Sequence, residues 1–73
     1  MNNAKKPTKY VYSIVLQGQY DGRTWDDIAE ASVNDPEELR QFRSDVKAYS
    51  ENEPYPHRVI RRRALNPEWK GAN

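Results

Sequence analysis

The sequence lacks cysteine and any long apolar run. None of its 73 residues is cysteine, which excludes disulfide bridges and thiolate metal sites and fits a reducing cytoplasm best. No stretch approaches the roughly 18 apolar residues of a membrane span, and no apolar signal-peptide core follows the lysines near the start. We therefore expect a soluble protein without a targeting or membrane segment.

A strong charge of one sign is also missing. Twelve Lys and Arg stand against eleven Asp and Glu, so the net charge of +1 is far from the basic balance of a dedicated nucleic-acid binder. A chain this short buries only about 60% of the surface that its unfolded form exposes, which leaves little room for a deep catalytic cleft. We expect one small domain that is not an enzyme.

Motifs for catalysis, metal binding and nucleotide binding are absent from the sequence as well. His57 is the only histidine, and without cysteine it cannot complete a familiar zinc cluster or a cysteine-histidine dyad. The glycines at positions 18 and 22 match neither the phosphate-loop nor the dinucleotide fingerprint. We predict no catalytic residue, no metal site and no cofactor.

The pattern of apolar residues predicts three strands. Residues 10–17, YVYSIVLQ, are rich in β-branched and aromatic side chains and indicate the first strand. The Asp-Gly dipeptide that follows indicates a hairpin, so residues 24–33 are interpreted as a second strand, although their apolar spacing also fits a helix. Residues 57–65 complete the set as the third strand.

The helix between the second and third strands is the clearest element. Asp35 is the predicted N-cap, Pro36 begins the first turn, and Glu38 completes a capping-box pattern. Apolar residues then recur at spacings of three, four and three, which places one stripe against the core. That stripe is Leu39, Phe42, Val46 and Tyr49. Asn52 is interpreted as a left-handed C-terminal residue, and the prolines that follow end the helix.

This order of elements predicts an α+β fold, β-β-α-β, in which a three-stranded antiparallel sheet carries one helix on one face. The domain is expected to span residues 9–65, with flexible tails at 1–8 and 66–73. The register of the second strand stays open. We expect a monomer, although an exposed edge strand also suits pairing with a second copy or with an extended peptide.

Alternation along the strands divides their side chains between two faces of the sheet. The bulkier row of the first strand, expected under the helix, is Tyr10, Tyr12, Ile14 and Leu16. If the first and third strands are neighbours, the opposite face carries a small apolar patch with an arginine rim, which suits docking of a protein partner. The candidate contact residues are Val11, Ser13, Val15, Arg58, Ile60 and Arg62.

Two other interpretations of this surface stay open. Open sheet faces often carry scattered valines and arginines that contact no partner. Alternatively, the last strand binds nucleic acid through Arg58, Arg61, Arg62 and Arg63. RNA-binding sheets usually present aromatic rings for base stacking, and the open row has none, so we expect no direct nucleic-acid contact. Outward-facing Tyr10 and Tyr12 would instead favour RNA.

Acidic residues gather around the predicted hairpin and oppose the basic last strand. Convergent carboxylates can hold a divalent cation or act as general acid and base. The ligand spacing of a calcium loop and a partner base are both missing, so a solvated acidic surface that orients a basic partner is the better interpretation. The candidate acidic patch is Asp21, Asp26, Asp27 and Glu30.

Two stretches carry a resemblance to a known family. YVYSIVLQGQYDGRTWDD and DPEELRQFRSDVKAYSENEPYPHRVIRRR, with the length of 73 residues, resemble the small transcription regulators of lytic Xanthomonas phages that bind the host RNA polymerase. The run YSENEPYPHRVIRRR is also similar to a segment of many small phage proteins without an assigned activity. The resemblance implies a non-enzymatic protein of the host bacterial cytoplasm. Such a protein would bind the N-terminal part of the polymerase β′ subunit, inhibit transcription initiation and promote antitermination.

Overall fold

The computed structural model describes residues 8–69 and contains the expected elements in the expected order. They are β1 (Tyr10–Gly18), β2 (Asp26–Ser32), α1 (Pro36–Asn52) and β3 (His57–Leu65). The central strand, β1, pairs antiparallel with β2 on one side and with β3 on the other. The predicted α+β fold is therefore confirmed, while residues 1–7 and 70–73 of the expected tails at 1–8 and 66–73 lie outside the described residues.

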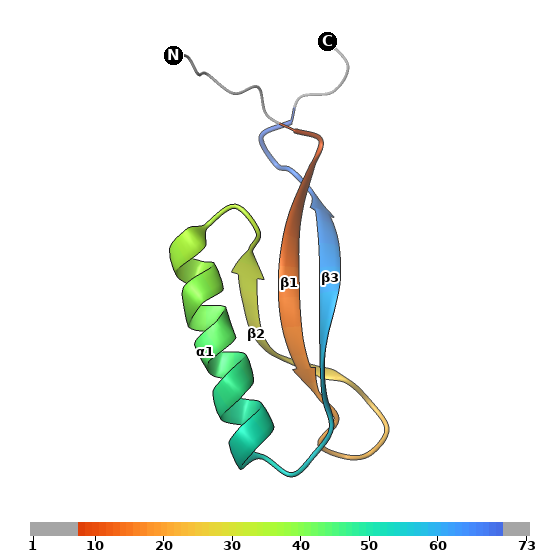
Figure 1. Ribbon diagram of the computed structural model, residues 1–73. Helices are drawn as coiled ribbons and strands as arrows, with labels where there is room; N and C mark the ends of the chain where they lie inside the picture. The colour runs from red at the N-terminus through yellow and green to blue at the C-terminus, as the bar shows by residue number, and fades with distance from the viewer. Residues whose placement is uncertain (1–7, 70–73) are drawn as a thin grey trace.

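The helix covers one face of the sheet on the side of β2 (Figure 1). Leu16, Ala31 and Phe42 form the buried centre of the core between helix and sheet. Around them pack Ile14, Ile28, Ala29, Leu39, Val46 and Tyr49. The predicted helix stripe is thus confirmed.

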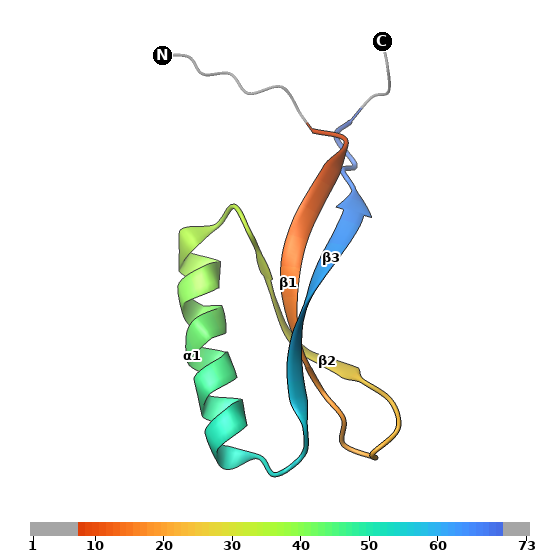
Figure 2. The same ribbon diagram turned by 45° about the vertical axis from the view of Figure 1, so that its right-hand side comes forward.

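The two tyrosines of β1 do not follow the expectation that their row packs under the helix. Tyr12 is 42% exposed and Tyr10 is half-buried. The reason is that the ends of β1 and β3 nearest the chain termini extend past α1 (Figures 1 and 2). Only Ile14 and Leu16 of the predicted row reach the core beneath the helix.

A β-bulge interrupts the pairing of β2 with β1. Leu16 lies opposite Ala29, but the next residue, Gln17, lies opposite Asp27, so Ile28 is the extra residue. As a result the consecutive apolar residues Ile28 and Ala29 both pack against the core. The bulge also reverses the alternation of faces along β2, which decides where its carboxylates point.

The N-terminus of α1 is capped as predicted, but the reciprocal half of the capping box does not form. Asp35 accepts hydrogen bonds from the N–H groups of Glu37 (3.0 Å) and Glu38 (3.2 Å). The Glu38 carboxylate accepts instead from the N–H of Ser32 at the end of β2 (2.9 Å). This contact joins the start of the helix to the sheet.

The C-terminus of α1 differs from the prediction. Asn52 is not left-handed, because no non-glycine residue among 8–69 has a positive φ. Glu53 is the C-cap in an extended conformation, which the following Pro54 favours, and its N–H donates to the carbonyl of Tyr49 (3.0 Å). No helix in this described part of the chain is long and apolar enough to cross a membrane.

Hydrogen bonding continues past β3 as far as Trp69. The N–H of Asn66 donates to the carbonyl of Lys9 (2.8 Å), and its side-chain amide donates to the carbonyl of Thr8 (2.9 Å). The N–H of Trp69 donates in turn to the carbonyl of Asn66 (3.0 Å). Residues 66–69 are therefore a turn held against the start of β1, beyond the expected domain boundary at residue 65.

Candidate functional site

The face of the sheet opposite α1, which we call the open face, receives side chains from all three strands. It consists of Val11, Ser13, Val15, Gln17, Asp27, Glu30, Ser32, Arg58, Ile60, Arg62 and Ala64. All six candidate contact residues lie on it, because β1 and β3 are neighbours and pair without interruption. Alternation therefore assigned these six residues to the correct face, and their exposure decides which of them are accessible to a partner.

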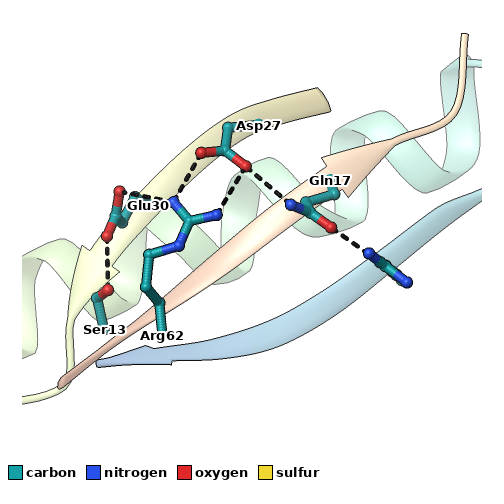
Figure 3. A network of polar contacts seen from close by, with 6 residues as sticks. Ser13, Gln17, Asp27, Glu30 and Arg62 are labelled. Carbon is teal, nitrogen blue, oxygen red and sulfur yellow. Dashed lines mark hydrogen bonds and ion pairs between the residues drawn. The ribbon is translucent and has the colours of Figure 1, made fainter. Parts of the chain in front are cut away.

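A network of polar contacts crosses the open face (Figure 3). The guanidinium group of Arg62 on β3 reaches across β1 and donates to both carboxylate oxygens of Asp27 on β2 (2.7 and 3.2 Å). It also lies 3.7 Å from the carboxylate of Glu30, which accepts a hydrogen bond from the hydroxyl of Ser13 (2.5 Å). The Gln17 amide donates to Asp27 (2.9 Å), so side chains join β1 to β2 and also join β2 to β3, which are not neighbours in the sheet.

The same network continues toward the β1–β2 loop. The Nε atom of Arg58 donates to the side-chain carbonyl of Gln17 (2.8 Å), and the guanidinium carbon lies 4.3 Å from the centroid of the Trp25 ring. Gln17 is therefore bonded at both ends of its amide, which is consistent with its burial at 6% exposure. Gln17 is not among the predicted site residues, although the sequence places it next to Val15 in the same row of β1.

Val15 is sealed by this arrangement. It is 0% exposed although it lies on the open face. On its own strand it is flanked by Ser13 and Gln17, both held in the network, and on the neighbouring strands it lies opposite Glu30 and Ile60. The expectation that Val15 belongs to an accessible apolar patch is wrong, since its side chain is buried and a partner could reach it only by dismantling the network.

The accessible apolar part of the open face lies nearer the chain termini. Val11 is 39% exposed, and Ile60 is half-buried. A shallow pocket of about 280 Å³ opens beside Val11, with Arg62 and Glu30 among its walls. Its lining also includes Tyr12, Ser13, Ser32, Glu38 and Ala64. The surface available for contact is thus displaced from the middle of β1 toward its start.

The four residues of the predicted acidic patch do not form one surface. Asp27 and Glu30 share Arg62 as their counter-ion, so their charges are already balanced within the open face. Asp26 lies opposite Gly18, one residue out of step with Asp27, and so belongs to the other side of β2. Within residues 8–69 no cluster of carboxylate and imidazole groups is arranged to hold a metal ion.

The fourth member, Asp21, shapes the β1–β2 loop. Its carboxylate accepts hydrogen bonds from the N–H groups of Thr24 and Arg23 (2.8 Å each) and from the Thr24 hydroxyl (3.0 Å). These bonds hold the pKa of Asp21 below its usual 3.8, and the bond from the Thr24 N–H has the largest effect. The residue therefore has a structural part in the loop rather than one in a shared acidic surface.

The four arginines of β3 are divided as alternation predicts. Arg58 and Arg62 belong to the network of the open face. Arg61 and Arg63 lie on the helix side, where the guanidinium carbon of Arg63 is 4.2 Å from the centroid of the Tyr10 ring. The run of three arginines in the sequence thus gives two separate basic environments.

Comparison with known proteins adds no assignment to this geometry. Neither protein-family models nor curated proteins nor solved structures contain a match to the chain. The open face itself offers fixed charges of both signs beside a small apolar area. Such an arrangement suits recognition of a complementary protein surface, because paired charges set orientation and exclude partners with the wrong charge pattern.

The contacts of Asp27 are expected to make the stability of the fold depend on pH. Hydrogen bonds from Arg62 and then from Gln17 lower the pKa of Asp27 from 3.8 to about 2. Because the folded-state pKa lies below the unfolded one, the stability that Asp27 contributes is complete above about pH 4 and is lost as the pH falls through about 2. In thermal melts followed by circular dichroism, we expect the wild-type melting temperature to fall more steeply over this interval than that of Asp27→Asn. Asp26→Asn, which removes a carboxylate from the other side of β2, is the matched control, and an unchanged slope in Asp27→Asn would contradict the ion pair.

Proposed function

We propose that this is a bacteriophage protein that binds the RNA polymerase of its bacterial host, at the N-terminal part of the β′ subunit, in the host cytoplasm. In this proposal binding inhibits initiation at host promoters and promotes antitermination. The resemblance of residues 10–27 and 35–63 to phage transcription regulators supports the choice of partner. The observation that supports the choice of surface is the open face, a whole side of the sheet that α1 leaves uncovered.

The open face has the physical properties that docking requires. Its long side chains already hold one another in place, so a partner need not immobilise them, and the entropic cost of association is reduced. Val11 and Ala64, which lie opposite each other, supply exposed apolar area. The Arg62 and Glu30 pair supplies a polar rim next to it.

Opposite effects on two stages of transcription need only one binding surface. A bound protein shifts the behaviour of the polymerase only by binding its different states with different affinities. Promoter complexes and elongation complexes are two such states, so the proposal requires tighter binding to the elongating enzyme than to the enzyme at a promoter. Occupation of one β′ surface would then disfavour initiation and favour continued elongation together.

An NMR titration of isotope-labelled protein with a purified N-terminal fragment of β′ tests the target and the surface together. We expect shifts at the β1 and β3 amides that surround the open face and little change along α1. Val11→Glu should weaken binding at least about ten-fold, because a charge would replace a central apolar contact. Val59→Glu is the matched control, since Val59 is 49% exposed on the opposite side of β3 and should bind as the wild type does.

Each failure has a separate meaning. If no amide moves, the β′ target is refuted, and if shifts gather on α1 or Val59→Glu alone weakens binding, the open face is the wrong surface. Circular dichroism melts establish that both variants are folded. In transcription assays with the host polymerase, the wild type should lower promoter-dependent initiation and raise read-through of a terminator, and Val11→Glu should lose both effects.

A further inference from the structure

A second surface lies on the helix side of the sheet, beyond the reach of α1. The ends of β1 and β3 near the chain termini extend past the helix (Figures 1 and 2). Tyr12 is 42% exposed there, and Arg63 lies directly opposite it in the strand register. We call this region the tyrosine-arginine surface, and it comprises Tyr10, Tyr12, Arg61 and Arg63.

Cationic groups lie against aromatic rings on this surface. The guanidinium carbon of Arg63 lies 4.2 Å from the centroid of the Tyr10 ring. The Lys9 ammonium group lies 5.5 Å from the same ring and 5.3 Å from the centroid of the Trp69 ring. Exposed cations and aromatic side chains from both ends of the described chain thus meet at one end of the sheet.

The charges here are not balanced as those of the open face are. Arg61 and Arg63 are both exposed, and neither forms a salt bridge with a carboxylate in residues 8–69. Arg62, between them in the sequence, is bonded to Asp27 on the other face. A near-neutral chain therefore carries a local positive surface that its overall net charge conceals.

We propose that the tyrosine-arginine surface binds single-stranded nucleic acid, with Arg61 and Arg63 on the phosphates and Tyr12 stacked against a base. Proteins that bind single strands combine cations that follow the backbone with exposed rings on which bases stack. The arginines of the open face are instead bonded to Gln17 and Asp27, and Arg58 also lies over the Trp25 ring. The inference differs from the expectation of no nucleic-acid contact because that expectation placed both tyrosines under the helix, and it does not rest on polymerase binding.

Fluorescence anisotropy with short labelled oligouridine and oligodeoxythymidine tests the proposal over a range of salt concentrations. The wild type should bind, and the double variant Arg61→Gln/Arg63→Gln should bind at least about ten-fold more weakly at low salt. The slope of log affinity against log salt should also become shallower by roughly 0.7 for each lost phosphate contact. Tyr12→Leu should weaken binding about five-fold or more without changing that slope, because stacking releases no counterions.

The matched control is Arg40→Gln/Arg43→Gln, which removes the same charge from exposed positions on α1. It should retain the affinity of the wild type, and an equal loss would overturn the proposed surface. The absence of wild-type binding to either oligonucleotide at low salt would overturn the proposal, as would equal competition by duplex DNA. If the Arg61 and Arg63 variant lost only β′ binding, the surface would be a protein contact and the proposal would again fail. The Arg61→Gln/Arg63→Gln variant should keep the wild-type affinity for β′, which separates this outcome from the polymerase test.

Discussion

Val15→Asp is expected to unfold the protein at room temperature. Val15 is 0% exposed, so the new carboxylate would lose its hydration, and an unpaired buried charge costs several kcal/mol. The usual stability per residue gives a 73-residue domain only about 4 to 11 kcal/mol in total. The nearby cations of Arg58 and Arg62 are already bonded to Gln17 and Asp27, and no ready counter-ion remains on this face.

Circular dichroism and thermal melts of Val15→Asp beside Val11→Asp give the comparison. Val11 is on the same strand and the same face but is 39% exposed, so its aspartate stays hydrated. That variant should stay folded, with a loss of about 0.5 kcal/mol or less. If Val15→Asp still folded cooperatively, the network on the open face would not shield this position from water as the structure indicates. Mapping of a partner therefore requires Val11, because loss of binding in Val15→Asp would report only loss of the fold.

Gly18→Ala is expected to destabilise the protein by about 1 to 3 kcal/mol, which is roughly 5 to 20 °C in melting temperature for a domain of this size. The cause is space and not backbone conformation, since Gly22 is the glycine with a positive φ in the described chain. A Cβ atom at Gly18 would lie 2.5 Å from Cε1 of Tyr55 and 2.9 Å from Cδ1 of Ile28. Both distances are shorter than van der Waals contact, so the Tyr55 ring has to move.

Tyr55 has little freedom to move. Its ring centroid lies 4.4 Å from that of Tyr20 and 4.6 Å from that of His57. Burial within this cluster is the first cause that raises the pKa of Tyr55 to about 12. The three rings come from the β1–β2 loop, the segment after α1 and the start of β3, so a displaced Tyr55 disturbs the connections at this end of the sheet.

Urea denaturation separates steric strain from conformational strain. Gly22 has a φ of 75° with open space around it, so Gly22→Ala should cost about 1 kcal/mol through backbone conformation alone. Gly22→Asn should cost less, because asparagine tolerates a positive φ. At Gly18 the steric clash should instead be relieved by a smaller side chain at position 55. The free-energy costs of Gly18→Ala and Tyr55→Leu should therefore be less than additive in the double variant. Fully additive costs would contradict the contact between them.

The features of the fold that were predictable are those that depend on local chemistry. The faces of β1 and β3 follow from alternation because the two strands pair from Tyr10 opposite Leu65 to Gly18 opposite His57 without a bulge. The start of α1 follows from the Asp35 side chain, which bonds the free N–H groups of the first turn. These signals lie within a few residues of the structure that they specify.

The pairing of Asp27 and Glu30 with Arg62 was not predictable in the same way. The two carboxylates are three residues apart, so regular alternation would place them on opposite faces. The bulge at Ile28 brings both onto the open face, and it depends on how β2 meets β1. Its only trace in the sequence is the pair of consecutive apolar residues Ile28 and Ala29, which also fits a helix.

The predicted exposures of Val15 and Tyr12 were both wrong, because exposure depends on which other elements cover a side chain. Alternation assigns Val15 to the open face but does not reveal that Arg62 spans from β3 to Asp27 on β2 across the same strand. Similarly, it assigns Tyr12 to the helix side, whereas the position of α1 beside β2 leaves that end of β1 uncovered. A side chain's face is a local property, and its exposure is not.

The order of the strands has a consequence for the newly synthesised chain. The ribosome makes the central strand β1 first and its neighbour β3 last. Until residues 57–65 emerge, one edge of β1 has no partner within the chain, and such an edge is a template for pairing with another polypeptide. Ile60, opposite Val15, is made only after β1, β2 and α1. The nascent protein therefore carries the strand YVYSIVLQG with one edge unprotected until β3 has been made, and the residues of β3 remove that exposure.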